Sequence, residues 1–237
     1  MICVLLCAGY ATRMYPLTEN FPKPLLDIKG KTIIDYLIDD LENKGNVSKY
    51  VIVSNHKFIN YFKEWRSKRK ETIVVLDDGS TCNDNRLGAV KDIEFAIEKE
   101  VIDDDIIVLA GDNLLDFSLN DFILFSKANN SNAIMTYEEN EIKRLQRTGV
   151  IEIDDNNKVL SFEEKPQEPK SNHAVPPFYI FKREDLHLIS KGIEEGCKVD
   201  APGMFIEWFA KQTDIYAWPM TGKRIDIGNL EDYYKIK

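Results

Sequence analysis

Short apolar runs alternate with amphipathic stretches through the first half of the chain. Runs without charged residues predict strands buried on both faces of a sheet, and they lie at residues 2–7, 50–53, 73–76 and 106–110. Apolar positions three and four residues apart predict helices at about residues 33–42, 57–69 and 87–98. The alternation indicates right-handed βαβ units, so we expect an α/β, Rossmann-like fold with a mostly parallel twisted sheet flanked by helices.

The second half has a different pattern. Residues 149–153 and 158–162 alternate apolar and polar positions on either side of a turn-forming Asp154-Asp-Asn-Asn157 segment, which predicts a small hairpin subregion. Pro176-Pro177 interrupts the strand expected at 173–181. The remaining pattern predicts helices at about 184–194 and 202–211, strands near 215–218 and 224–226, and a short terminal helix. Asp200 is the expected N-cap of the helix that has Pro202 in its first turn.

Composition narrows the class of protein. A net charge of −9 argues against a nucleic-acid backbone as the main partner, since that contact needs a basic surface. The N-terminal apolar run is too short for a signal peptide or a membrane span, so we expect a cytoplasmic protein without a membrane partner. The four cysteines form no C-x-x-C pair, and Cys3 and Cys7 read as core residues. Both a monomer and a homo-oligomer are compatible with this composition.

The first apolar run leads into a loop of small residues that carries Arg13 and, further on, Lys23. Small residues let backbone N–H groups approach phosphate oxygens, and the two cations offset phosphate charge, so the loop suits a nucleoside triphosphate. It is not a P-loop, because Leu25 stands where the first glycine is required, and Ala11 and Met14 break the dinucleotide fingerprint. In parallel sheets ligands bind at the carboxyl ends of strands, which predicts one shared site for the loops that follow them.

Residues 6–18, Leu-Cys-Ala-Gly-Tyr-Ala-Thr-Arg-Met-Tyr-Pro-Leu-Thr, and the later Pro22-Lys-Pro-Leu25 resemble the signature of sugar-1-phosphate nucleotidylyltransferases. Ala11 stands where that family has glycine. The resemblance implies one nucleotidyltransferase domain over residues 1–237, with a nucleotide-binding half at 1–130 and an acceptor-binding half at 131–237. Arg13 and Lys23 would bind the triphosphate. The other loop residues implied to contact the nucleotide are Leu6, Ala8, Gly9, Tyr10, Ala11 and Thr12.

Two aspartates follow predicted strands and suit a metal. Asp112 lies in Gly111-Asp-Asn113 after the strand at 106–110, where a carboxylate would face bound phosphates. Asp226 lies in a segment that resembles the family's W-x-D-(I/V)-G-T. Mg²⁺ prefers oxygen ligands and binds through one or two carboxylates together with substrate phosphates. We therefore expect Mg²⁺ as the cofactor, with Asp112 and Asp226 as its ligands and Asp112 also beside the nucleotide.

Ser161-Phe-Glu-Glu-Lys-Pro166 resembles the family's F-x-E-K-P. Carried over, Lys165 would hold the attacking phosphate and Glu164 the sugar, which completes an implied catalytic set with Arg13, Lys23, Asp112 and Asp226. The further acceptor-binding residues implied are Asn113, Gly149 and Tyr179. Gly88 matches the family glycine beside the base, and Asn83 is a candidate for reading it. The glutamine that often reads a pyrimidine has no counterpart here, so the base stays open.

The acceptor also stays open. Where the family often has N-x-G-x-Y, Pro177 occupies the glycine position, which indicates a reshaped acceptor pocket. A sugar 1-phosphate is the expected substrate. One alternative is a cytidylyltransferase for phosphocholine, because aromatic side chains could hold a quaternary amine; they are Phe178, Tyr179, Phe205 and Trp208, with Glu207. Another is a non-catalytic nucleotide-sugar-binding regulatory protein. The three histidines adjoin no nucleophile motif, so a hydrolytic triad has no support.

Overall fold

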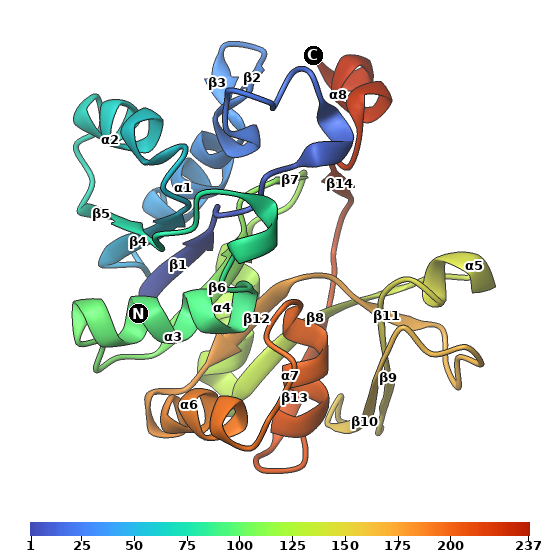
Figure 1. Cartoon of the computed structure of the whole chain (residues 1–237). Helices are drawn as coiled ribbons and strands as arrows, with labels where there is room; N and C mark the ends of the chain where they lie inside the picture. The colour runs from blue at the N-terminus through green and yellow to red at the C-terminus, as the bar shows by residue number, and fades with distance from the viewer. The chain divides into compact units, whose positions relative to one another are not determined.

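The first three apolar runs form parallel strands in the computed structural model, which describes all 237 residues. Strand β1 (Ile2–Leu6) pairs in parallel with β4 (Lys49–Ser54), and β4 pairs in parallel with β5 (Ile73–Asp77). Figure 1 shows these strands side by side, with the N-terminus at the start of β1. The middle of each of the first two strands is fully buried, as runs without charged residues predict.

The chain divides into two compact units, each built from segments far apart in sequence. The first unit comprises Met1–Leu87, Leu109–Asn120 and Gly222–Lys237, and the second comprises Gly88–Val108 and Asp121–Thr221. Strand β6 (Ile106–Ala110) crosses from the second unit into the first. The single domain with halves at 1–130 and 131–237 stays a prediction.

Two helices of the first unit follow the predicted pattern. Helix α1 (Ile33–Glu42) has the predicted bounds and buries all five residues of its apolar stripe. The carboxylate of Asp35 accepts a hydrogen bond of 2.9 Å from the backbone N–H of Thr32 at its N-terminus. Helix α2 (Ile59–Ser67) is shorter than predicted; it buries Phe62 and Trp65, while Tyr61 is 39% exposed. The aromatic face of α2 is thus mainly core.

Short elements complete the first unit. Strands β2 (Asp27–Ile28) and β3 (Lys31–Thr32) form an antiparallel pair, and β7 (Asn113–Leu115) pairs antiparallel with β14 (Arg224–Asp226). Helix α8 (Leu230–Ile236) ends the chain. A separate apolar cluster joins these elements to the loop after β1; its buried members are Met14, Leu26, Ile28, Ile33, Ile227 and Tyr233. The candidate phosphate loop packs on this cluster through Met14.

The second unit is a mixed sheet around β8 (Asn132–Glu138). Strands β11 (His173–Val175) and β12 (Phe178–Phe181) pair with β8 antiparallel, and β13 (Ile215–Pro219) pairs with it in parallel. The predicted hairpin is confirmed as β9 (Gly149–Ile153) and β10 (Val159–Glu164), and β9 also pairs with β11. Pro176-Pro177 separates β11 from β12, as the sequence indicated.

The helices of the second unit are α3, α4, α5, α6 and α7. Helix α4 (Leu119–Asn129) starts in the first unit, and the others are α3 (Ala89–Glu100), α5 (Ile142–Leu145), α6 (His187–Glu194) and α7 (Pro202–Phe209). The prediction of Asp200 as N-cap of α7 is wrong, because Ala201 is the N-cap residue and the backbone of Asp200 instead accepts from Ala89. In the acidic run Asp103–Asp105, Asp105 is ion-paired with Lys182 at 2.7 Å.

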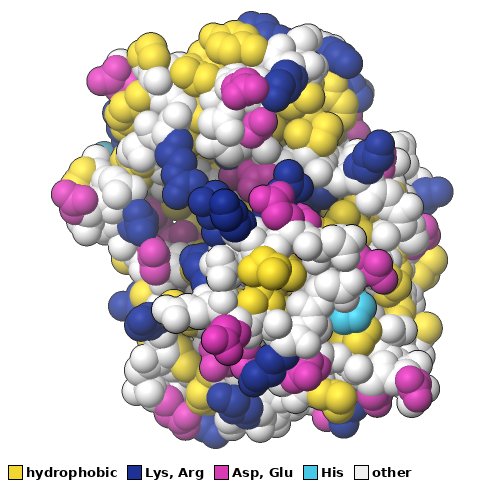
Figure 2. Space-filling view, turned by 90° about the vertical axis from the view of Figure 1, so that its right-hand side faces the viewer, with side chains coloured by type: hydrophobic (Ala, Val, Ile, Leu, Met, Phe, Trp, Pro, Cys, Tyr) yellow, Lys and Arg dark blue, Asp and Glu magenta, His cyan; other side chains and the backbone are white.

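The predicted α/β class, with a mostly parallel sheet flanked by helices, is confirmed, and the antiparallel pairs lie chiefly in the second unit. Acidic and basic side chains are interspersed on the face shown in Figure 2. None of the four cysteines forms a disulfide, and Cys3 and Cys7 are buried core residues as predicted. None of the helices combines the length and the apolar character needed to cross a membrane.

Candidate functional site

The backbone of the loop after β1 is hydrogen-bonded to the end of β4, and the side chain of Arg13 in this loop is exposed. The side-chain amide of the fully buried Asn55, at the end of β4, donates a hydrogen bond of 2.9 Å to the carbonyl oxygen of Ala8. Ala8 and Tyr10 are buried, whereas Gly9, Thr12 and Arg13 are exposed. Sequence reasoning did not single out Asn55, although its place at a strand's carboxyl end was a usable signal. The first unit thus presents Arg13 on an anchored loop.

Ala11 takes a left-handed conformation, which glycine adopts without strain. Its backbone has φ 46° and ψ 42°, just before the short 3₁₀ turn Thr12–Met14. The fully buried Thr18 donates its hydroxyl to the carbonyl oxygen of Ala11 at 2.8 Å. The loop therefore keeps this conformation despite the alanine, and a side-chain hydrogen bond within the loop helps to hold it.

Lys23 is buried rather than solvated. It begins the 3₁₀ turn Lys23–Leu25, between Pro22 and Pro24, and only 8% of its surface is exposed. Its Nζ lies 2.6 Å from Oδ2 of Asp112, which forms both a hydrogen bond and an ion pair. The structure thus brings together two predicted catalytic residues that are 89 positions apart in sequence.

Asp112 and Asp226 are held side by side by the β7–β14 pair. Asp226 lies opposite Asn113 in the register, and the backbone N–H of Ile227 donates to the carbonyl oxygen of Asp112 at 3.3 Å. Burial raises the pKa of Asp226, and the negative charge of Asp112 raises it further, although 53% of the Asp226 side chain is exposed. The two carboxylates therefore repel each other electrostatically.

Arg224 and Asn113 connect the two aspartates. The Asn113 amide donates to Oδ1 of Asp112 at 2.8 Å, and Nη1 of Arg224 donates to Oδ1 of Asn113 at 2.6 Å. The same Nη1 lies 3.7 Å from Oδ2 of Asp226. Sequence reasoning missed Arg224, yet alternation along a strand places residues 224 and 226 on one face, and this was the available signal.

This arrangement suits a hard cation that a substrate helps to bind. The described chain gathers no cluster of three or more acidic, histidine or cysteine ligands, so the protein alone offers no complete cage. Asp112 and Asp226 supply hard carboxylate oxygens, which fit Mg²⁺ when phosphates and waters complete its octahedron. The donor set of the first unit therefore fits Mg²⁺ bound together with a phosphorylated ligand.

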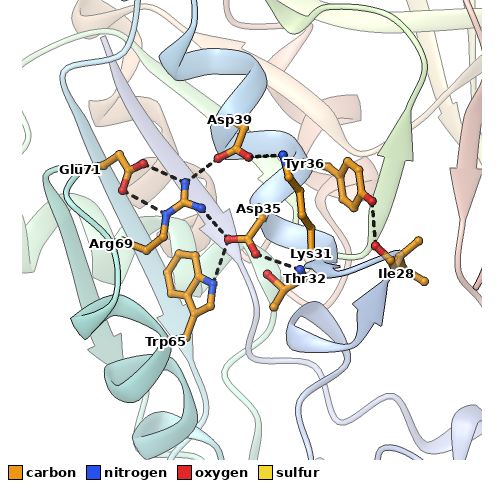
Figure 3. A network of polar contacts seen from close by, with 9 residues as sticks. All are labelled: Ile28, Lys31, Thr32, Asp35, Tyr36, Asp39, Trp65, Arg69 and Glu71. Carbon is orange, nitrogen blue, oxygen red and sulfur yellow. Dashed lines mark hydrogen bonds and ion pairs between the residues drawn. The ribbon is translucent and has the colours of Figure 1, made fainter.

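A polar network in the first unit joins the β2–β3 hairpin, helix α1 and the segment around Arg69 (Figure 3). The guanidinium of Arg69 forms ion pairs with Asp35, Asp39 and Glu71 at 2.7–2.9 Å. Partial burial raises the pKa of Asp39, but hydrogen bonds from Lys31 and Arg69 lower it more, so the pKa of Asp39 lies below its ordinary value. The network ties helix α1 to the segment after helix α2.

The second unit holds the predicted Glu164 and Lys165 at the end of β10. The Glu164 side chain is 8% exposed and its Oε1 lies 3.2 Å from Nζ of the half-exposed Lys165. A Cβ atom at Gly203, in the first turn of α7, would lie 1.9 Å from Oε2 of Glu164, so a larger residue there would displace this carboxylate from its present position. Lys165 has φ 51°, a strained conformation of the kind that functional sites retain. Sequence reasoning did not identify Gly203.

The remaining predicted residues are more dispersed. Gly149 packs against Phe162, whose ring would be 2.4 Å from an added Cβ, and Tyr179 is buried in β12. Gly88 has φ 95° and fits against the backbone of Val199 in the second unit. Asn83 is exposed in the first unit. Asn113 lies beside Asp112, as described above. Roles for these residues in binding the base or the acceptor stay predictions.

The chain is similar to known proteins along its whole length. Residues 2–237 match the family model described as nucleotidyl transferase. The chain is 31% identical to the bifunctional protein GlmU of Methanocaldococcus jannaschii over 81% of this chain and 42% of that protein. It is 28% identical to the glucose-1-phosphate adenylyltransferase of Fervidobacterium nodosum over 99% of this chain and 60% of that protein. The chain thus spans less than two thirds of the length of these relatives.

Solved structures share the fold. A UDP-glucose pyrophosphorylase complexed with UDP-glucose superposes with a TM-score of 0.82 and 19% identity, covering 99% of this chain and 96% of that one. At this identity the likeness concerns the fold alone, and the family assignment rests on the family match over residues 2–237. The predicted resemblance is confirmed, and the chain belongs to the nucleotidyl transferase family.

Proposed function

We propose that this protein joins a nucleoside triphosphate to a sugar 1-phosphate, giving a nucleotide sugar and pyrophosphate, with Mg²⁺ as the cofactor. The observation that carries the proposal is the contact of Lys23 with Asp112 next to Asp226, in the same unit as the anchored loop of Arg13. A triphosphate needs cations for its charge and a metal needs carboxylates, and the first unit supplies both. Glu164 and Lys165 of the second unit are the proposed acceptor residues.

The proposed reaction is an in-line attack of the acceptor phosphate on the α-phosphorus. The acceptor phosphate is ionised at neutral pH, so no protein group has to remove a proton. Arg13 and Lys23 offset the charge that develops on the departing pyrophosphate, and Lys165 is the proposed ligand of the attacking phosphate. Mg²⁺, bound by Asp112 and Asp226, would neutralise phosphate charge and orient the triphosphate.

Burial of three of the four candidate aromatic side chains favours a sugar over phosphocholine as acceptor; the fourth, Trp208, is partly exposed, and its indole N–H donates to Oε2 of Glu195 at 3.0 Å. Phe178 and Phe205 are fully buried and Tyr179 is 3% exposed. The ring of Phe205 packs at 5.4 Å from Phe209 between centroids, as core aromatic rings do. A quaternary amine needs open ring faces, which these buried residues lack. The relatives' names, which include glucose-1-phosphate adenylyltransferase, point the same way for those proteins.

The test is a matrix of reactions that combines each of the common nucleoside triphosphates with hexose 1-phosphates and with phosphocholine, read as Mg²⁺-dependent pyrophosphate release. We expect release with at least one sugar 1-phosphate and none with phosphocholine. Release with phosphocholine alone would identify the cytidylyltransferase alternative. If no pair released pyrophosphate while nucleotide sugars raised the melting temperature, the regulatory alternative would replace the proposal.

A further inference from the structure

Lys23 and Asp112 neutralise each other within the first unit. A buried ammonium is costly unless an acceptor of opposite charge is close. Lys23 has 8% of its surface exposed, and its Nζ lies 2.6 Å from Oδ2 of Asp112. The other carboxylate oxygen, Oδ1, accepts the amide of Asn113 at 2.8 Å. Both oxygens of Asp112 are therefore engaged within the protein.

Asp226 has a cation beside it as well. Nη1 of Arg224 lies 3.7 Å from Oδ2 of Asp226 and is fixed by its hydrogen bond to Asn113. The two carboxylates thus have one lysine and one arginine as neighbours, so their formal charges cancel. Asp232 adds a negative charge near Asp226, so the lysine and the arginine reduce, without removing, the attraction of this pair for a divalent cation, and at Asp112 the cation would approach an ammonium group.

The two neighbouring cations differ in their freedom to move. The guanidinium of Arg224 is planar, always charged, and held at Asn113, whereas a lysine ammonium is a point charge on a flexible stem. Lys23 is also one of the two cations proposed for the triphosphate. The same ammonium therefore has two candidate anionic partners, Asp112 and a phosphate oxygen, and one of these is also the candidate metal ligand.

We propose that Lys23 is the resident counter-cation of Asp112, that a divalent metal displaces it from this carboxylate, and that the triphosphate then takes up the freed ammonium. The inference rests on the proposed function for the identity of the phosphate ligand. Metal and triphosphate binding are then coupled. The metal replaces the ammonium of Lys23 as the partner of Asp112, and a phosphate oxygen replaces Asp112 as the partner of Lys23, so each ligand favours binding of the other. The ammonium of Lys23 at Asp112 thus weakens metal binding until a triphosphate offers it another anionic partner.

The experiment measures Mn²⁺ binding to the ligand-free protein by the electron paramagnetic resonance signal of free Mn²⁺. Removing the competing charge in Lys23→Gln should tighten Mn²⁺ binding by about tenfold. Lys68→Gln is the matched control: it makes the same charge change at a side chain that is 70% exposed and paired with Glu64, and it should leave the affinity unchanged. A folded K23Q that binds Mn²⁺ no more tightly than the unsubstituted protein would overturn the proposal.

A second arm measures tripolyphosphate, a probe without a base, by calorimetry in saturating Mn²⁺. K23Q should bind it more weakly, while binding Mn²⁺ alone more tightly. These opposite signs distinguish charge exchange from general damage, which would weaken both. If K23Q did not fold, Lys23→Arg would be measured instead. This variant keeps the positive charge, so it should bind Mn²⁺ as weakly as the unsubstituted protein. Tighter Mn²⁺ binding by Lys23→Arg would contradict the exchange. The Mn²⁺ arm holds whether or not nucleotidyl transfer is detected, so the two proposals fail separately.

Discussion

The hydroxyl of Thr18 donates a hydrogen bond of 2.8 Å to the carbonyl oxygen of Ala11, a non-glycine residue with φ 46°. This side chain fixes the loop in a conformation that costs an L-residue free energy. The loop thus holds an alanine, with the help of a hydrogen bond, in a conformation that glycine adopts without strain.

Replacing Ala11 by glycine should stabilise the protein. Glycine adopts positive φ without strain, so Ala11→Gly should raise the free energy of unfolding by about 1 kcal/mol, partly offset by the greater freedom of the unfolded chain. Denaturant titration measures the change. Ala96→Gly, inside helix α3, is the opposite-sign control and should lower stability by about 1 kcal/mol. A loss of stability in Ala11→Gly would mean that the left-handed conformation carries no strain.

Neutralising either candidate metal ligand should abolish most activity without unfolding the protein. Asp112→Asn and Asp226→Asn keep the side-chain shape but remove a charge, so each should lower Mg²⁺-dependent pyrophosphate release by at least about a hundredfold. Circular dichroism checks the fold, and Asp155→Asn in an exposed turn should retain full activity. Near-normal release from both ligand variants would refute the metal assignment.

A methyl group at Gly203 should weaken acceptor binding through Glu164. The added Cβ would overlap Oε2 of Glu164, whose flexible side chain must then move. We expect Gly203→Ala to raise the acceptor KM by about tenfold and to leave the nucleotide KM nearly unchanged. In a double-mutant cycle with Glu164→Gln the two effects should not add, since both act on one carboxylate. Additive effects would show that Gly203 acts elsewhere.

The Arg69 network should stabilise the protein at neutral pH and less so in acid. Arg69→Met leaves its three acidic partners without their shared cation, which should cost about 2 kcal/mol at pH 7. The pKa values of Asp39 and Glu71 are lowered in the folded protein, so their stabilisation is present above the ordinary carboxyl pKa and is lost as pH falls through the lower folded values. The difference between Arg69→Met and the unsubstituted protein should therefore shrink below about pH 4. An effect independent of pH would indicate lost packing instead.

The longer elements were predictable because burial imposes a clear pattern. The strand at Ile106–Ala110, helix α1 and the β9–β10 hairpin agree closely with the predicted ranges. Strands of two or three residues, such as β2, β3 and β7, carry too few positions to show a period, and their existence depends on distant partners. The end of the chain illustrates this, since β14 is defined by pairing with β7 more than a hundred residues earlier.

Site residues that belong to a sequence motif could be predicted, whereas residues that reach the site only through a tertiary contact could not. Asp112 and Asp226 were identified from their sequence segments. The ion pair of Lys23 with Asp112 joins residues 89 positions apart, and no local sequence pattern indicates it. Arg224 was missed because an arginine two residues from an aspartate is common on surfaces. The N-cap of α7 was misplaced by one residue, since backbone contacts of Asp200 with Ala89 decided it.

The apolar cluster beneath the phosphate loop imposes an order on biosynthesis. Met14 and Leu26 emerge from the ribosome early, but they are sealed by Ile227 and Tyr233, and the hydroxyl of Tyr233 also donates to the carbonyl oxygen of Asp27. The loop cannot reach its final packing until the last helix has been synthesised, even though the strand beside it is complete long before. During translation the nascent chain therefore exposes this apolar surface for most of its length, and a chain that stops short of residue 227 would present it permanently to chaperones and proteases.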